Sequence, residues 1–315
     1  MSQQSSVDVV IPVFEPGRDD KLLRTLARLA KQETPVRRVI LMNTDESCYT
    51  LWAERERIAE RFPFAEVHHV TREAFDHAAT RNAGGALSDA AYLLFMTMDA
   101  VPADTKLVTK LLMAMQSDGT CAIAYARQLA ARDAGEAEKC ARAFNYPARS
   151  HRKTILDEAR LGIKAAFASN VCALYDRTVW EELGGFQAPA IFNEDMVYAH
   201  TALLAGYSIR YCADARVIHS HNYTARQQFH RNFDLGVSQA MHPEVFAGTH
   251  SESEGKKFVM MTLRHLWSRG RLLQIPGYLV GCAARYAGFL LGRNYRKLPR
   301  TCILKFTNNK SFWKA

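Results

Sequence analysis

The sequence predicts an α/β fold, in which a largely parallel sheet carries helices on both faces. Through about the first hundred residues, apolar runs of strand length alternate with amphipathic segments of helix length. Polar residues follow several of these runs directly, as they do where ligands gather at the carboxyl ends of parallel strands. The hydrophobic content of 48% is ordinary for a globular protein and supports a sizeable core.

The first part of the chain shows the alternation most clearly. Residues 7–13 are a continuous apolar strand pattern that ends at the turn Phe14-Glu15-Pro16-Gly17. The expected strands are residues 7–13, 38–42, 66–70 and 92–99. The expected helices between them are residues 21–30, 51–62 and 75–89. Four strands linked by three helices indicate βαβ units.

The second part is less regular. A helix is expected over 104–115, a strand over 121–125, and a mobile loop with short helices, near an acceptor site, over 126–164. The elements expected after this loop are a strand-like stretch at 164–175, helices at 177–183 and 196–205, and short strands at 208–211 and 215–218. Gly206 lies where a helix C-cap is expected.

The run 92–99 ends in a single carboxylate, Asp99, which it presents at the carboxyl end of a buried strand. The chain contains neither Gly-x-Gly-x-x-Gly after the first strand nor a phosphate-binding Gly-x-x-x-x-Gly-Lys. A nucleotide at this edge therefore needs its charge neutralised in another way. A divalent cation (Mg²⁺ or Mn²⁺) on Asp99 would bind carboxylate and phosphate oxygens together. A turn or helix-capping aspartate is the alternative interpretation.

Two further clusters are candidates for the same site. Glu194 and Asp195 open a helix, where the dipole stabilises carboxylates, so they have a structural explanation as well. His219 and His221 follow a strand, and residues two apart in a strand face the same side. Either both histidines bind one metal ion, or one binds it and the other is a hydrogen-bonding neighbour.

The excess of positive over negative charge comes from the C-terminal segment. Of 41 Lys and Arg, thirteen lie between Gly255 and Ala315, a segment without Asp or Glu, and leucine, tryptophan and valine lie among them. This pattern favours an amphipathic helical extension on an anionic membrane surface, with a homodimer contact or a solvated basic face as alternatives. No nucleic-acid partner is predicted, because the aromatic residues sit among Leu and Val at helical spacing.

The chain has no apolar span long enough to cross a bilayer, which takes about 20 residues. Its polar start, Met1 to Ser6, does not read as a signal peptide. Seven scattered cysteines without C-x-x-C spacing indicate a reducing compartment. A cytoplasmic protein is therefore expected.

Several motifs in sequence order resemble the family 2 glycosyltransferases of the GT-A fold, and among them the bacterial rhamnosyltransferases that use dTDP-rhamnose. The likeness covers about 240 residues and implies a GT-A catalytic domain at 1–240 with a helical extension at 241–315. Its marks are Val10-Ile11-Pro12-Val13-Phe14, Phe75-Asp76-His77, Thr80-Arg81-Asn82-Ala83-Gly84, Phe95-Met96-Thr97-Met98-Asp99-Ala100, Phe167-Ala168-Ser169-Asn170, Gly184-Gly185-Phe186, Glu194-Asp195, Gly206-Tyr207 and His219-Ser220-His221.

The resemblance implies a role for each matching position. Asp195 corresponds to the catalytic base, and Asp99 to the last aspartate of the D-x-D motif, whose first place is taken by Thr97. The residues implied for the nucleotide sugar are Phe14, Glu15, Asp45, Arg81, Thr97, Met98 and Arg231. Those implied for the acceptor side are Ser169, Asn170 and Glu194, and for the metal Asp99, His219 and His221.

The implied reaction is inverting transfer of L-rhamnose from dTDP-β-L-rhamnose to a hydroxyl of a lipid-linked glycan at the inner face of the cell membrane. A single base without a second carboxylate across the sugar separates it from glycoside hydrolysis. The alternatives are a family 2 transferase for a UDP-hexose or UDP-N-acetylhexosamine, and a non-catalytic glycan- or nucleic-acid-binding protein.

Overall fold

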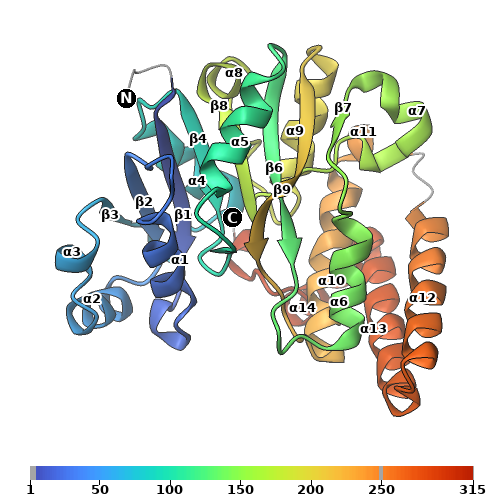
Figure 1. Ribbon diagram of the computed structural model, residues 1–315. Coiled ribbons are helices and arrows are strands. Elements are labelled where there is room, and N and C mark those ends of the chain that lie inside the picture. Colours follow the sequence, from blue (N-terminus) through green and yellow to red (C-terminus); the bar gives the residue numbers. More distant parts are fainter. Residues whose placement is uncertain (1–4, 248–250, 315) are drawn as a thin grey trace.

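The computed structural model describes residues 5–247 and 251–314 and shows one mixed sheet flanked by helices (Figure 1). The strands are β1 (Val7–Val13), β2 (Arg38–Asn43), β3 (Ala65–His69), β4 (Tyr92–Met96), β5 (Val101–Pro102), β6 (Cys121–Leu129), β7 (His151–Lys153), β8 (Cys172–Asp176) and β9 (Ser208–Ile218). Their order is β3-β2-β1-β4-β8-β6-β9-β5, and β7 pairs with β9.

Fourteen α-helices occur in the described part of the chain. They are α1 (Lys21–Leu29), α2 (Glu46–Arg55), α3 (Ile58–Arg61), α4 (His77–Ala86), α5 (Leu107–Gln116), α6 (Glu136–Asn145), α7 (Glu158–Leu161), α8 (Arg177–Glu182), α9 (Glu194–Leu204), α10 (Ala225–Met241), α11 (Pro243–Phe246), α12 (Ser251–Ser268), α13 (Ile275–Arg293) and α14 (Arg300–Phe306).

Both faces of the sheet are covered, as the sequence predicted. Alternate residues of β1 serve two cores: Val7 and Val9 pack with α1, α2 and α5, whereas Val10 packs with α4, α8 and α9. This division follows from the two-residue period of a strand. The near-continuous apolar run of β1 therefore reflects a strand that is buried on both sides.

The sheet is less parallel than the alternation suggested. β3, β2, β1 and β4 are parallel to one another, but β8 runs antiparallel to both β4 and β6. β5 and β7 also run antiparallel to β9. The expected α/β fold is thus confirmed in a mixed, GT-A-like form.

Several predicted boundaries were wrong for local reasons. The helix expected over 51–62 is two helices, because Arg57 adopts a left-handed conformation (φ 54°) between α2 and α3. α2 also begins earlier, where the Asp45 side chain caps it by accepting from the Cys48 amide.

Three other boundaries differ further along the chain. The stretch expected to be extended from 164 onward forms β8 only from Cys172, and residues 162–164 form a 3₁₀ turn. The two short strands expected after Gly206 are one strand, β9. Within 126–164, β6 continues to Leu129 and α6 and β7 follow it.

The C-terminal helices pack against the rest of the chain. α13 lies alongside α10 (Figure 1), and glycines bring the two backbones close together. A Cβ on Gly292 would lie 2.1 Å from the Phe233 carbonyl oxygen, and one on Gly288 would lie 2.3 Å from that of Phe229. Only glycine allows this approach. Within the described residues, every helix is too short or too polar to cross a bilayer.

Candidate active site

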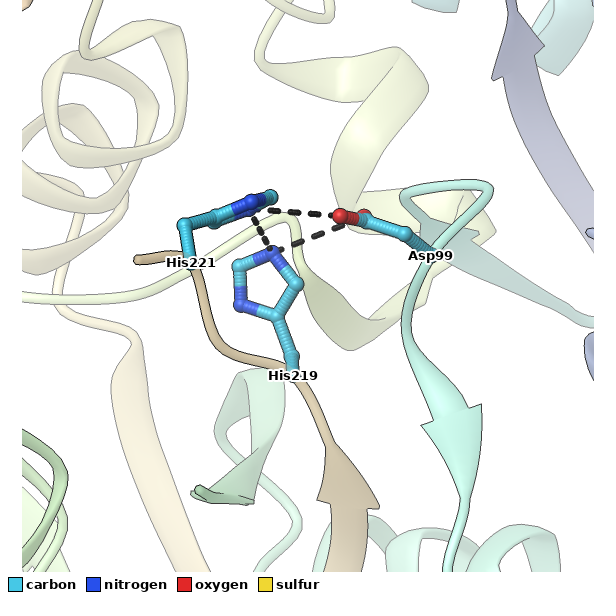
Figure 2. A group of neighbouring side chains, drawn as sticks. All are labelled: Asp99, His219 and His221. Atoms are coloured by element: carbon cyan, nitrogen blue, oxygen red, sulfur yellow. Dashed lines mark hydrogen bonds and ion pairs between the residues drawn. The ribbon is translucent and has the colours of Figure 1, made fainter. Parts of the chain in front are cut away.

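Asp99, His219 and His221 converge beyond the carboxyl ends of β4 and β9 (Figure 2). His219 Nε2 lies 3.5 Å from Asp99 Oδ1, and His221 Nε2 lies 3.2 Å from Asp99 Oδ2. The two Nε2 atoms are 3.0 Å apart. Neighbouring ligands of a cation with bonds of about 2.1 Å are separated by about 3 Å, so the three side chains fit one divalent ion.

The neighbours of the two histidines orient them for such an ion. The Nδ1 atom of His219 lies 3.0 Å from Gln128 Oε1. Since an amide oxygen can only accept, His219 carries its proton on Nδ1 and leaves the Nε2 lone pair toward Asp99. Burial lowers the pKa of His219 to about 3, which keeps the ring neutral. The ring of His221 stacks on Tyr223, with centroids 4.8 Å apart.

The candidate base, Asp195, lies at the start of α9. Asn193 adopts a left-handed conformation (φ 61°), and its side-chain Nδ2 donates to the Ser238 hydroxyl of α10, so the helix begins abruptly. The Asp195 carboxylate accepts from the Asn170 amide at 3.0 Å. Burial, and then the charge of Glu194, raise the pKa of Asp195 to about 7. A carboxylate of this basicity suits general base work near neutral pH.

Glu194 is held by an ion pair. It accepts from Arg81 of α4 at 3.2 Å and from the Asn170 side chain at 3.2 Å. The side chain of the next residue, Asn82, forms two hydrogen bonds with the backbone of Phe186. It donates to the Phe186 carbonyl and accepts from the Phe186 amide. Arg81-Asn82 thus joins α4 to both the acidic turn and the Gly184-Gly185-Phe186 turn.

A cavity of about 640 Å³ lies on the side where a nucleoside is expected. Phe14 and Thr44 line it together with Arg72, whose guanidinium stacks on the Phe14 ring at 5.2 Å. The carboxylate of Asp45 forms an ion pair with the guanidinium of Arg72, with Oδ2 and Nη2 2.6 Å apart. Residues from the C-terminal end, Asn308 to Ser311 and Lys314, form another wall.

A second cavity, of about 430 Å³, contains the candidate catalytic groups. Asp195, His219 and His221 all line it, so the base and two of the metal-ligating residues face one space. The other expected residues on its wall are Arg81, Thr97, Ser169, Asn170, Glu194 and Arg231.

Four of the expected residues, Glu15, Asp45, Met98 and Asp99, line neither cavity. Glu15 has a left-handed conformation (φ 48°) at the turn after β1 and lines neither cavity. The Met98 side chain packs against the core, and its carbonyl accepts from the Thr25 hydroxyl.

The structure also brings in residues that sequence reasoning missed. Arg142 and Tyr146, from the segment expected to be a loop, line the second cavity, as does Gln128. Arg285 of α13 reaches it as well. One feature of the sequence could have indicated Arg285: it is the sole charged residue in the apolar stretch 275–292.

The fold is that of the GT-A glycosyltransferases, and the chain belongs to the glycosyl transferase family 2, whose model matches residues 8–184. It is 34% identical to the O-antigen chain rhamnosyltransferase RfbN of Salmonella typhimurium over 313 residues, which are 98% of this chain and 96% of that protein. It is 37% identical to the O-antigen chain rhamnosyltransferase WbaN of Salmonella anatum over 248 residues, 78% of each. The chain is therefore a glycosyltransferase with rhamnosyltransferase homologues.

Solved structures share the fold at low sequence identity. The mannosyltransferase PcManGT from Pyrobaculum calidifontis, in complex with GDP-Man and Mn²⁺, superposes with a TM-score of 0.58 at 14% identity, covering 91% of this chain and 86% of that one. Residues 1–349 of TarS from S. aureus give 0.52 at 12% identity, covering 92% and 91%. These likenesses confirm the GT-A architecture.

Proposed function

We propose that this protein transfers L-rhamnose from dTDP-β-L-rhamnose to a hydroxyl of a lipid-linked cell-surface glycan, with inversion to an α-L-rhamnoside. The observation that carries the proposal is the shared cavity, which Asp195 faces together with His219 and His221. Two relatives, matched over 96% and 78% of their lengths, are named O-antigen rhamnosyltransferases, which supports the choice of sugar and of acceptor class.

In this reaction Asp195 accepts the proton of the acceptor hydroxyl as its oxygen bonds to the anomeric carbon. The bond from that carbon to the diphosphate oxygen breaks on the opposite face, and dTDP leaves. General base assistance of this kind contributes typically about 10²–10⁴-fold. The Asn170 amide holds the carboxylate in place, since it donates to Oδ2 at 3.0 Å.

Charge on the leaving diphosphate must be neutralised, and we assign this task to a cation on Asp99, His219 and His221, together with Arg231. A divalent cation held by Asp99, His219 and His221 would supply Lewis-acid stabilisation of that charge. Imidazole ligands favour Mn²⁺ over Mg²⁺. Arg231 lines both cavities, at their junction with Tyr223, and its guanidinium stacks on Phe192 at 4.7 Å.

The test is donor turnover across dTDP-rhamnose, UDP-hexoses, UDP-N-acetylhexosamines and GDP-mannose, with Mg²⁺, Mn²⁺ or EDTA. We expect turnover of dTDP-rhamnose that depends on the cation and is lost in Asp99→Asn and Asp195→Asn. Preference for a UDP-sugar would overturn the donor assignment and leave the family intact. Unchanged activity in Asp195→Asn would overturn the mechanism.

We further propose that the α12–α13 hairpin attaches the protein to the inner face of the cell membrane. Figure 1 shows its turn at the bottom of the view, away from the sheet. Trp267 and Leu273 at this turn are 70% and 97% exposed, and Arg269 and Arg271 lie between them. Apolar tips with flanking cations and no acidic residue suit an anionic bilayer.

Vesicle sedimentation tests this attachment. Vesicles with about one third phosphatidylglycerol should retain the wild type at low salt, as the surface potential predicts. Trp267→Ser/Leu273→Ser should release it without changing turnover of a soluble acceptor. Retention of the double variant would contradict the proposal, and a dimer that this variant dissociates would assign the same surface to a second copy of the chain.

A further inference from the structure

Arg285 lies on the face of α13 that packs against α10. It precedes Gly288 by three residues and Gly292 by seven, and residues at these spacings share one side of a helix. Both glycines contact the α10 backbone, so Arg285 is directed inward along the same stripe. It is the only charged residue between Ile275 and Gly292, in a helix whose opposite side exposes Leu279, Val280 and Tyr286.

The second cavity contains four arginines, which differ in their partners. Arg81 pairs with Glu194, and Arg142 pairs with Glu138 at 2.7 Å. Among the residues that the structure describes, Arg231 and Arg285 have no carboxylate within ion-pair distance. The Nε of Arg285 is buried and no described acceptor reaches it. Arg285 is half-buried and permanently charged, and a buried nitrogen without an acceptor is costly, so this position suits an anionic ligand.

The position of Arg285 distinguishes it from Arg231. Arg231 lines both cavities and is placed for the donor diphosphate at their junction. Arg285 lines only the cavity of Asp195, where α6 contributes Arg142 and Asn145, and it is absent from the wall of the nucleoside cavity. An anion at Arg285 therefore belongs on the acceptor side of the base.

We propose that Arg285 is the residue that binds a phosphate group of the lipid-linked acceptor. This inference rests on the proposed glycosyl transfer and deepens it. A guanidinium binds phosphate oxygens through two parallel hydrogen bonds, which fixes the ligand's orientation as well as its charge. The helix that carries Arg285 also forms one arm of the exposed apolar hairpin. A lipid tail at the hairpin and a phosphate at Arg285 would present the sugar hydroxyl to Asp195.

The test measures binding of decyl diphosphate by calorimetry, with saturating dTDP and Mn²⁺ present to fill the donor site. Decyl maltoside serves as the uncharged probe and inorganic pyrophosphate as the lipid-free anion. The variants are Arg285→Gln, Arg285→Met and Arg285→Lys. The matched control is Arg293→Met, which removes an exposed arginine from the same helix, outside both cavities.

We expect Arg285→Gln and Arg285→Met to weaken decyl diphosphate binding by about tenfold to a hundredfold, as loss of a charge-assisted pair predicts. Arg285→Lys should weaken decyl diphosphate binding less than these two variants, and Arg293→Met should leave it unchanged. Affinity for dTDP should stay unchanged in all four variants. Pyrophosphate should bind more weakly than decyl diphosphate, and equal binding would overturn the lipid-linked assignment.

Three results separate the inference from the proposed function. If the wild type binds dTDP but decyl diphosphate does not bind, or binds equally well to Arg285→Gln, the acceptor-phosphate site is wrong and the transferase proposal stands. If dTDP itself does not bind, the donor assignment fails. If Arg285→Gln loses dTDP affinity while Arg285→Lys keeps it, the positive charge at position 285 serves the donor, and the inference is overturned.

Discussion

The raised pKa of Asp195 leads to a prediction in which activity and stability move in opposite directions. Burial and the neighbouring Glu194 raise this pKa from 3.8 to about 7. A base must be ionised, so about a tenth of the enzyme is active one pH unit below this pKa and about a hundredth two units below. We expect kcat/KM to rise about tenfold per pH unit from about pH 5 to about pH 7, and then to level off.

The same shift has the reverse effect on folding. Between about pH 4 and pH 7 the native state binds a proton at Asp195 that the unfolded chain has released, so the free energy of unfolding falls as pH rises. The loss is complete above the folded-state pKa and is at most about 4 kcal/mol at 1.36 kcal/mol per unit. Asp195→Asn keeps an oxygen for the Asn170 amide and carries no charge.

Asp195→Asn should therefore lose about 10²–10⁴-fold in kcat/KM and should be more stable than the wild type at about pH 8, with the difference shrinking toward about pH 4. Activity is followed as dTDP release at saturating cation, and stability by urea denaturation at matched pH values. Binding of dTDP across the same range is the control for metal loss. A wild-type rate that is flat between about pH 5 and pH 8, or a variant less stable at about pH 8, would refute this reasoning.

Three other predictions follow from contacts around the site. Gln128→Met removes the acceptor that orients His219, so it should weaken Mn²⁺ binding about 10–100-fold. Isothermal titration calorimetry measures this binding, and an unchanged affinity for Mn²⁺ would contradict the orienting role of Gln128. Gly292→Ala places a Cβ 2.1 Å from the Phe233 carbonyl oxygen, so the free energy of unfolding should fall by about 1–3 kcal/mol in urea, and no change would show that α13 packs loosely. Burial lowers the pKa of Lys153 to about 7, so its neutral form is favoured in the fold. The free energy of unfolding should rise from about pH 7 to about pH 10 in the wild type and stay level over this range in Lys153→Met. Equal slopes of this free energy against pH in the two proteins would refute the role of Lys153.

The sequence alone was sufficient for the parts of the site that are local along the chain. Asp99 follows a buried strand, and His219 and His221 share one side of the chain beyond another, so strand periodicity and strand ends were enough to nominate them. The acidic pair Glu194-Asp195 was likewise visible as a helix start. Family motifs then gave these residues an order and a reaction.

Partners that come from distant segments could not be read in this way. Gln128 lies within a strand and carries no motif, yet its side-chain oxygen sets the tautomer of His219, ninety-one residues later in the chain. The left-handed conformation of Arg57 divided an expected helix through backbone geometry that its side chain does not announce. The antiparallel insertion of β8 between β4 and β6 is a long-range pairing that local alternation cannot specify.

The amino-acid sequence by itself determined which segments are buried, which residues end them, and where the positive charge collects, because hydrophobic period and composition act locally. Only the tertiary structure decided that α13 lies against the second cavity, whose wall includes Arg285 and Asp195. Three glycines, one on α10 and two on α13, permit two backbones to meet at a distance that any side chain would prevent, and Arg285 is carried inward with them. That approach depends on both helices at once, so neither segment of sequence contains it.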